Sequence, residues 1–252
     1  DARCFVYDPE VRSVVGRTPS FGSDELNDHH FHYGYFLYAA GVVAADDPAL
    51  AADLAPVLDL LAADVASGAS DEDFPALRVF DAYAGHSWAS GYAPFADGNN
   101  QESASEAVSA WNGLALWARA SGDATLETQA RWLMSAEASS ARAYWTDFDR
   151  DDPAIDGFGH TVTSLVWGGK RDWATWFSAE PSAMLGILVL PMQPVAGYLG
   201  GDPERIRANL DEALAGPRDD PATWDVLFGD QLLMYAALAG PDDAAAALDV
   251  AR

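Results

Sequence analysis

Polar and apolar positions repeat with a period near 3.6 residues over several segments of the chain, which predicts amphipathic helices. The first segment is residues 47–65, with Asp47 as the expected N-cap and Pro48 in the first turn. Pro56 is expected to bend or interrupt this helix, because proline lacks the backbone N–H that the helix needs. The apolar stripe consists of Leu50, Leu54, Val57, Leu58, Leu61 and Val65.

A second amphipathic segment, residues 202–216, has the same design. Asp202 is the expected N-cap, Pro203 lies in the first turn and Gly216 is the expected terminator. The stripe consists of Ile206, Leu210, Ala213 and Leu214.

Residues 125–145 and 230–252 also show helical patterns. No strand-length run recurs at the spacing that a sandwich or barrel of strands needs. No close internal sequence repeat is evident. The pattern therefore predicts a mostly α-helical protein.

Residues 67–100 interrupt this pattern with a segment rich in glycine, proline and aromatic residues. A loop of this length in a compact domain is usually functional. His86, Trp88, Tyr92 and Phe95 favour function, since a mere connector does not need them. The alternative is a satellite hydrophobic cluster folded over the surface.

The loop leads into a predicted helix start. Ser103 and Glu106 have the spacing of a capping box. Glu102 and Glu106 are four residues apart and share a face if both are helical. They are either a functional pair or first-turn glutamates favoured by the helix dipole.

The segment "NDHHFHYGYF", residues 27–36, combines one acid, three histidines and four aromatic rings. Neither an apolar core nor a solvated face accounts for this mixture. Aromatic side chains can stack on sugar rings, and two acidic groups, such as Asp28 and Glu102, are the minimum for glycosidic cleavage. One protonates the leaving oxygen, and the other activates water.

Composition excludes several other classes of function. The chain of 252 residues has a net charge of −25 and 14 Lys and Arg, so nucleic acid and anionic membranes are poor partners. The acidic surplus is spread along the chain, as in a solubilising surface or in adaptation to high salt. Cys4 is the single cysteine, which excludes an internal disulfide and a cysteine zinc cluster. The longest apolar run, "MLGILVLPM", is too short to span a bilayer.

A metal site is the competing interpretation of His29, His30 and His32. No His-x-x-x-His pair places two imidazoles on one helical face here. A serine hydrolase is less favoured still, because no G-x-S-x-G elbow accompanies the serines.

Four segments, in order, closely resemble the glycoside hydrolase family 81 endo-β-1,3-glucanases. They are "NDHHFHYGYF", "DAYAGHSWASG", "DGNNQESASEAVSAW" and "VWGGKRDWATWF". The similarity covers roughly residues 21–199, and "GILVLPMQP" resembles a further family segment.

The resemblance implies an inverting hydrolase of laminarin-type β-1,3-glucan. The implied fold class is all-α, an (α/α)6 toroid with the long aromatic, glycine-rich loop lining the cleft. By similarity, Asp28 matches the general acid, Glu102 the general base and Glu106 a supporting acid, although which glutamate is the base stays open. The expected substrate-binding residues are His30, His32, Tyr33, His86, Trp88 and Asn100.

The same resemblance sets expectations for the whole protein. Residues 1–252 are expected to form a single helical catalytic domain without the β-sandwich that usually precedes it in the family. The chain is short for a complete toroid and is expected to be a fragment or a reduced member. We expect a monomer that binds β-1,3-glucan and needs no cofactor and no metal. We also expect the protein to be secreted, because its substrate is a polymer. The alternatives are a non-catalytic β-glucan-binding module and a metal-dependent hydrolase that uses His29, His30 and His32.

Overall fold

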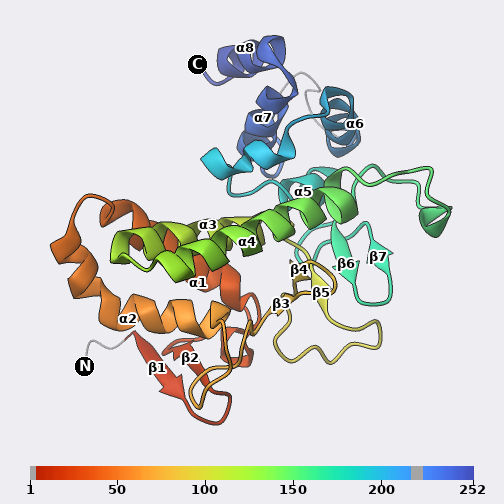
Figure 1. Ribbon diagram of the computed structural model, residues 1–252. Coiled ribbons are helices and arrows are strands. Elements are labelled where there is room, and N and C mark those ends of the chain that lie inside the picture. The colour runs from red at the N-terminus through yellow and green to blue at the C-terminus, as the bar shows by residue number, and fades with distance from the viewer. Residues whose placement is uncertain (1–3, 217–223) are drawn as a thin grey trace. The chain divides into compact units, whose positions relative to one another are not determined.

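The computed structural model describes residues 4–216 and 224–252, and most of this part of the chain is helical (Figure 1). The prediction of a mostly helical protein is confirmed. The chain divides into two compact units. One comprises Asp1–Gln101 with Glu106–Glu137, and the other comprises Glu102–Ser105 with Ala138–Arg252. Each unit is described by itself.

The first unit packs helices beside a short hairpin. Strands β1 and β2 pair antiparallel, with Val6 opposite Val15. In chain order, the elements are β1 (Phe5–Asp8), β2 (Ser13–Gly16), a 3-10 helix (Ser23–Glu25), α1 (His29–Val43), α2 (Pro48–Ala66), β3 (Phe80–Asp81), β4 (His86–Ser87), β5 (Asn100–Gln101), α3 (Ala104–Ser121) and α4 (Ala124–Ser140). Helices α1 to α4 lie side by side (Figure 1).

Helix α2 confirms the first predicted helix. The Asp47 carboxylate accepts hydrogen bonds from the backbone N–H groups of Ala49 and Leu50, as an N-cap does. Pro56 was expected to bend or interrupt the helix. The helix continues through it, so the interruption is wrong and the bend stays a prediction. Leu58 and Leu61 are buried in the core beyond the proline, and this packing outweighs the hydrogen bond that proline removes.

Helix α1 was not predicted, and close packing against α3 is its main feature. A Cβ atom added at Gly34 would lie 2.5 Å from the Cα of Ala110, and one at Gly41 would lie 2.7 Å from the backbone of Leu116. Glycine is therefore required where the two helices meet. The core around them contains Leu37, Leu61, Val65, Trp111, Leu114, Trp117 and Leu133.

The predicted loop, residues 67–100, contains no helix in the structure. Strands β3 and β4 pair antiparallel within it, with Asp81 opposite His86. The Asp81 carboxylate accepts hydrogen bonds from the backbone N–H groups of Tyr83 and Ala84, which closes the turn between the strands.

The second unit consists of short helices and one β-hairpin. The Asp202 carboxylate caps α6 through the N–H groups of Glu204 and Arg205, as predicted, but the helix ends at Ala213, before Gly216. The elements are a π-helix (Ala141–Thr146), a 3-10 helix (Pro153–Ile155), β6 (Leu165–Trp167), β7 (Arg171–Asp172), α5 (Pro181–Gly186), a 3-10 helix (Pro194–Leu199), α6 (Pro203–Ala213), α7 (Gly229–Ala236), a 3-10 helix (Ala237–Ala239) and α8 (Pro241–Val250).

The predicted helical segment 230–252 is divided in two. Gly240 adopts an extended conformation that ends the helical path, and Pro241 begins α8. Over the residues that the structure describes, no helix is both long and apolar enough to cross a bilayer.

Candidate active site

Asp28 lies at the N-terminal boundary of α1, in the left-handed region with φ of 53°. Its N–H donates to the carbonyl of Ala89 at 2.7 Å, and its carbonyl accepts from the N–H of His32 at 2.9 Å. The N–H of Ala89 in turn donates to the carbonyl of Asn100 at 2.8 Å. Backbone contacts therefore join the first three of the four family-like segments and hold Asp28 in a conformation that costs about 1–2 kcal/mol.

The Asp28 carboxyl is partly buried and close enough to Glu106 to feel its charge. Burial, and then the negative charge of Glu106, raise the pKa of Asp28 from 3.8 to about 7. A carboxyl group with this pKa carries its proton up to neutral pH and can donate it to a leaving oxygen. The expected acid thus has the protonation behaviour that general-acid catalysis requires.

Glu106 occupies the first turn of α3, and its carboxylate accepts a hydrogen bond of 2.8 Å from the hydroxyl of Tyr35. Burial and the charge of Glu106 raise the pKa of Tyr35, so the phenol stays protonated and donates. The sequence analysis missed Tyr35. The available signal was its place in the segment of residues 27–36, which also contains Asp28.

Glu102 belongs to the second unit. Its carboxylate accepts a hydrogen bond of 2.8 Å from the N–H of Trp176. The exposed Trp176 ring packs edge-on against Trp167, with 5.8 Å between centroids. Two of the family-like segments, those that contain Glu102 and Trp176, therefore meet in this unit.

The three histidines of the first segment have different surroundings. His32 is half-buried, and burial and then His29 lower its pKa. His30 is completely buried, and burial together with the neighbouring histidines lowers its pKa well below 6.5. Both rings are therefore neutral at pH 7.

The other expected substrate-binding residues also occupy distinct positions. Tyr33 is buried, and its hydroxyl donates to the carbonyl of Val14. His86 is buried and packs edge-on against Trp88, whose indole N–H donates to the Asp81 carboxylate at 3.2 Å. Asn100 is buried beside Ala89, as described above. Their roles in substrate binding stay predictions.

A cavity of about 670 Å³ lies beside His32 and Tyr35. Aromatic rings form much of its wall, and Arg17 and serine hydroxyls add polar groups. The aromatic residues are Phe5, Phe21, Tyr33, Tyr35 and Phe36. Such a mixture of stacking surfaces and hydrogen-bonding groups suits a neutral sugar.

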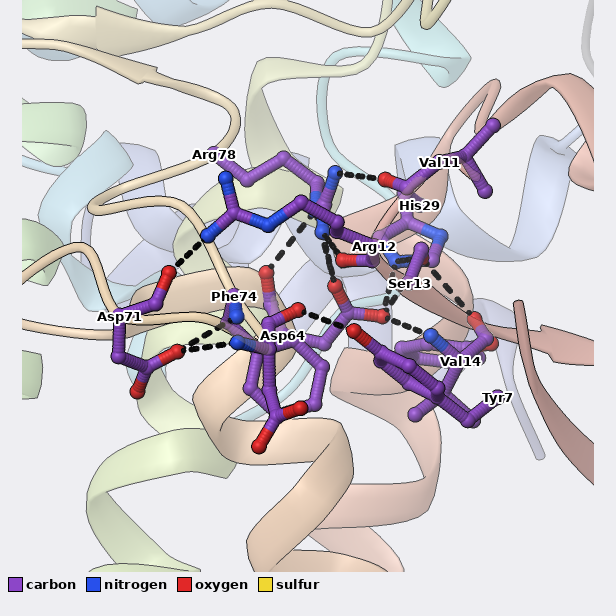
Figure 2. A network of polar contacts seen from close by, with 12 residues as sticks. Tyr7, Val11, Arg12, Ser13, Val14, His29, Asp64, Asp71, Phe74 and Arg78 are labelled. Carbon is purple, nitrogen blue, oxygen red and sulfur yellow. Dashed lines mark hydrogen bonds and ion pairs between the residues drawn. The ribbon is translucent and has the colours of Figure 1, made fainter. Parts of the chain in front are cut away.

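A buried carboxylate, Asp64 of α2, anchors the residue that follows Asp28 (Figure 2). One Asp64 oxygen accepts from the hydroxyl of Ser13 and the N–H of Val14, both at 2.8 Å, and lies 2.9 Å from Nε2 of His29. The other accepts from Nε of Arg78 at 2.8 Å. The β1–β2 hairpin, α1, α2 and the loop therefore meet at one side chain.

The charge of Asp64 is favoured by these partners. Burial alone would raise the pKa of its carboxyl, but the hydrogen bonds and charges of His29, Arg78 and Ser13 outweigh burial and lower it. Arg78 also donates to the carbonyls of Val11 and Arg12 (Figure 2). The sequence analysis did not identify Asp64, because its partners come from three other segments of the chain.

The histidine cluster does not form a shared site. His29 contacts Asp64, and His30 contacts Ser87 at 2.8 Å. Among the described residues, no group of three or more His, Cys, Asp or Glu side chains has the arrangement of a metal site.

Comparison with known proteins gives consistent matches. The sequence model described as the glycosyl hydrolase family 81 C-terminal domain matches residues 2–246. A glucan endo-1,3-β-D-glucosidase of Acetivibrio thermocellus is 42% identical over 95% of this chain and 31% of its own length. One of Thermobifida fusca is 39% identical over 97% of this chain and 32% of its own length. The chain thus spans about a third of the length of these relatives.

A solved structure is also similar. The glycoside hydrolase family 81 protein of Clostridium thermocellum, in a glutamate-to-alanine mutant form, matches with a TM-score of 0.86 and 42% identity. The match covers 97% of this chain and 34% of that chain.

Proposed function

Because the chain belongs to glycoside hydrolase family 81, we propose that it hydrolyses internal β-1,3 bonds of a laminarin-type glucan with inversion. The observation that carries this proposal is the Asp28 carboxyl, whose pKa of about 7 keeps a proton available beside the carboxylate of Glu106. The names of the relatives supply the substrate class.

In the proposed reaction, Asp28 gives its proton to the glycosidic oxygen as the bond to the anomeric carbon breaks. Water attacks the opposite face of the same carbon and loses its proton to a glutamate. Glu102 is the proposed base, and Glu106, held by Tyr35, supports the water or the base. The product sugar has the inverted configuration, and the glutamate then releases its proton to solvent while Asp28 takes one up.

Substrate binding is proposed for the aromatic cavity beside Asp28's helix. Phe21 is 83% exposed and Phe36 is 51% exposed, so both rings are accessible to a sugar face. His32 and Tyr35 connect this cavity to the carboxyl groups. His30, His86 and Asn100 are buried and Trp88 is half-buried, so we propose that these residues shape the substrate-binding site from within.

We further propose that residues 1–252 act as one catalytic region and contribute helices of an (α/α)6 toroid, with the segment 67–100 lining its cleft. A polymeric substrate favours a secreted protein. We also propose that the protein works as a monomer without a cofactor. The chain's relatives are about three times longer, so further parts of such an enzyme can complete the cleft.

Release of reducing ends from laminarin tests the proposed function. We expect release by the wild-type chain and a loss of orders of magnitude in Asp28→Asn, whereas Asp24→Asn, an exposed matched control, stays active. Binding of laminarin without hydrolysis would favour the glucan-binding module. Loss of activity in EDTA would favour the metal-dependent hydrolase.

The two glutamates need a separate comparison. We expect Glu102→Gln and Glu106→Gln both to lower turnover, with the larger loss in the variant of the base. Azide can replace the attacking water in the absence of a base. Recovery of glycosyl azide formation in one variant and not in the other identifies the base.

A further inference from the structure

Glu137 of α4 is a completely buried acidic residue of the first unit. It accepts hydrogen bonds from the N–H of Ser87 at 2.9 Å, from Nε2 of Gln101 at 2.7 Å and from the indole N–H of Trp111 at 3.1 Å. These donors come from β4, β5 and α3. A single side chain therefore joins four elements of the first unit.

The contacts of Glu137 continue to His30. The Ser87 hydroxyl donates to Oε1 of Gln101 at 3.1 Å, so Nε2 of His30 is the donor in its 2.8 Å contact with that hydroxyl. The His30 ring also stacks on Trp111, with 5.5 Å between centroids and 21° between planes. His30 thus contacts two of the three residues that Glu137 binds.

The positions of these residues relate the network to the candidate acids. His30 is two residues after Asp28 on α1. Gln101 and Trp111 are each five residues from Glu106, on either side of it. The network thereby holds the helix start that carries Asp28 and the helix start that carries Glu106.

Burial raises the pKa of the Glu137 carboxyl to about 7, whereas the hydrogen bonds from Trp111, Ser87 and Gln101 act in the opposite direction and favour its ionised form. An ionised carboxylate only accepts hydrogen bonds, and three donors point at this one. An amide in its place would direct an N–H group at one of those donors. A buried N–H donor that has no acceptor destabilises the fold by about 1–3 kcal/mol.

We propose that Glu137 is a positioning residue, which fixes Asp28 and Glu106 relative to each other through Ser87, Gln101, Trp111 and His30. The inference rests on the proposed function, because it assigns Asp28 and Glu106 to catalysis. Glu137 itself has no exposed surface and does not touch the sugar.

The kinetic test compares Glu137→Gln with Glu127→Gln, a carboxylate-to-amide change on the same helix that affects the ion pairs with Arg119 and Arg131. We expect Glu137→Gln to lower kcat for laminarin about tenfold or more while KM changes less than about twofold. Glu127→Gln should keep both values. A loss confined to KM, or a wild-type kcat, would overturn the inference.

Titration of the Asp28 carboxyl by ¹³C NMR tests positioning without activity. In the wild type we expect a midpoint near 7. We expect the Asp28 midpoint to fall by about half a pH unit or more in Glu137→Gln and in Trp111→Phe, because Asp28 gains water or moves away from Glu106. Trp111→Phe keeps the buried carboxyl group of Glu137. Unchanged midpoints in both variants overturn the inference.

The double variant Glu137→Gln with Gln101→Glu exchanges the amide and the carboxylate. We expect it to recover a large part of kcat and of the Asp28 midpoint, which a general loss of stability would not allow. If Glu137→Gln does not fold, Trp111→Phe and Ser87→Ala decide the question by the same two measurements. A wild-type chain that does not hydrolyse laminarin refutes the proposed function, whereas the Asp28 titration still decides the inference.

Discussion

The hydroxyl of Tyr35 donates a hydrogen bond of 2.8 Å to the carboxylate of Glu106. Tyr35 lies in the second turn of α1, and Asp28 is the N-cap residue directly before this helix. Glu106 also raises the pKa of Asp28 through its charge. The N-terminal part of α1 therefore positions both the expected acid and a group that binds its acidic neighbour.

This hydrogen bond predicts slower turnover in the variant Tyr35→Phe. The variant keeps the ring but removes the donor, so Glu106 loses a fixed partner, and we expect kcat for laminari-oligosaccharides to fall about tenfold or more with a similar KM. Tyr38→Phe, on the same helix, serves as the matched control. Equal kinetics of the two variants would show that the hydrogen bond is dispensable.

The pKa of Asp28 predicts the alkaline side of the pH profile. The carboxyl is protonated below about 7 and loses its proton above it. We expect kcat/KM to fall as the pH rises through 7, by up to tenfold for each further pH unit. Rates of laminarin hydrolysis from pH 5 to 9, with folding monitored by circular dichroism, measure this. A flat profile up to pH 9 contradicts the assignment of Asp28 as the acid.

The same shift predicts that Asp28→Asn stabilises the fold at neutral pH. The folded pKa is raised above the unfolded value, so the folded state binds more protons between pH 3.8 and about 7, and its stability falls across that range. An amide has no such dependence. We expect Asp28→Asn to be more stable than the wild type by about 1–3 kcal/mol at pH 8, with a smaller difference at pH 4. Urea denaturation at both pH values measures it, and an equal stability at pH 8 would contradict the prediction.

The Asp64 network predicts a loss of stability. Asp64→Asn leaves Arg78 without its buried counter-ion, so we expect a loss of about 3 kcal/mol in the free energy of unfolding at pH 7. Asp53→Asn, exposed on the same helix, is the matched control and should be neutral.

The pH dependence of that loss has a defined sign. The folded pKa of Asp64 is lowered, so its contribution is present above the ordinary pKa near 4 and disappears as the pH falls through the folded value. The deficit of Asp64→Asn should therefore shrink in acid. A deficit that stays constant down to pH 2 would mean that ion pairing is not its source.

Product stereochemistry tests the mechanism independently of the named carboxylates. A single displacement at a β-1,3 bond first releases the α-anomer, whereas a covalent intermediate leads to the β-anomer. We expect proton NMR during the first minutes of hydrolysis to show the α signal growing before the β signal, ahead of mutarotation. An initial β product would assign a glutamate as nucleophile instead of base.

The mostly helical fold, the family and two helices with their caps could be predicted from the sequence alone. Asp47 and Asp202 are recognisable because a cap and the N–H groups that it binds lie within three residues of each other. Helix α1 was not predicted, because histidine, aromatic and small residues occupy several of its faces. Its apolar residues therefore form no clear stripe.

Only the folded structure shows which side chains contact Glu106 and Glu137. Tyr35 meets Glu106, and Glu137 meets Ser87, Gln101 and Trp111, across 26 to 71 positions of sequence. Periodicity and capping describe neighbours within a few turns and contain no information about such contacts. The raised pKa of Asp28 likewise arises from burial and from a charge on another helix. Those quantities exist only after the chain has folded, because desolvation and Coulomb energy depend on distance in space.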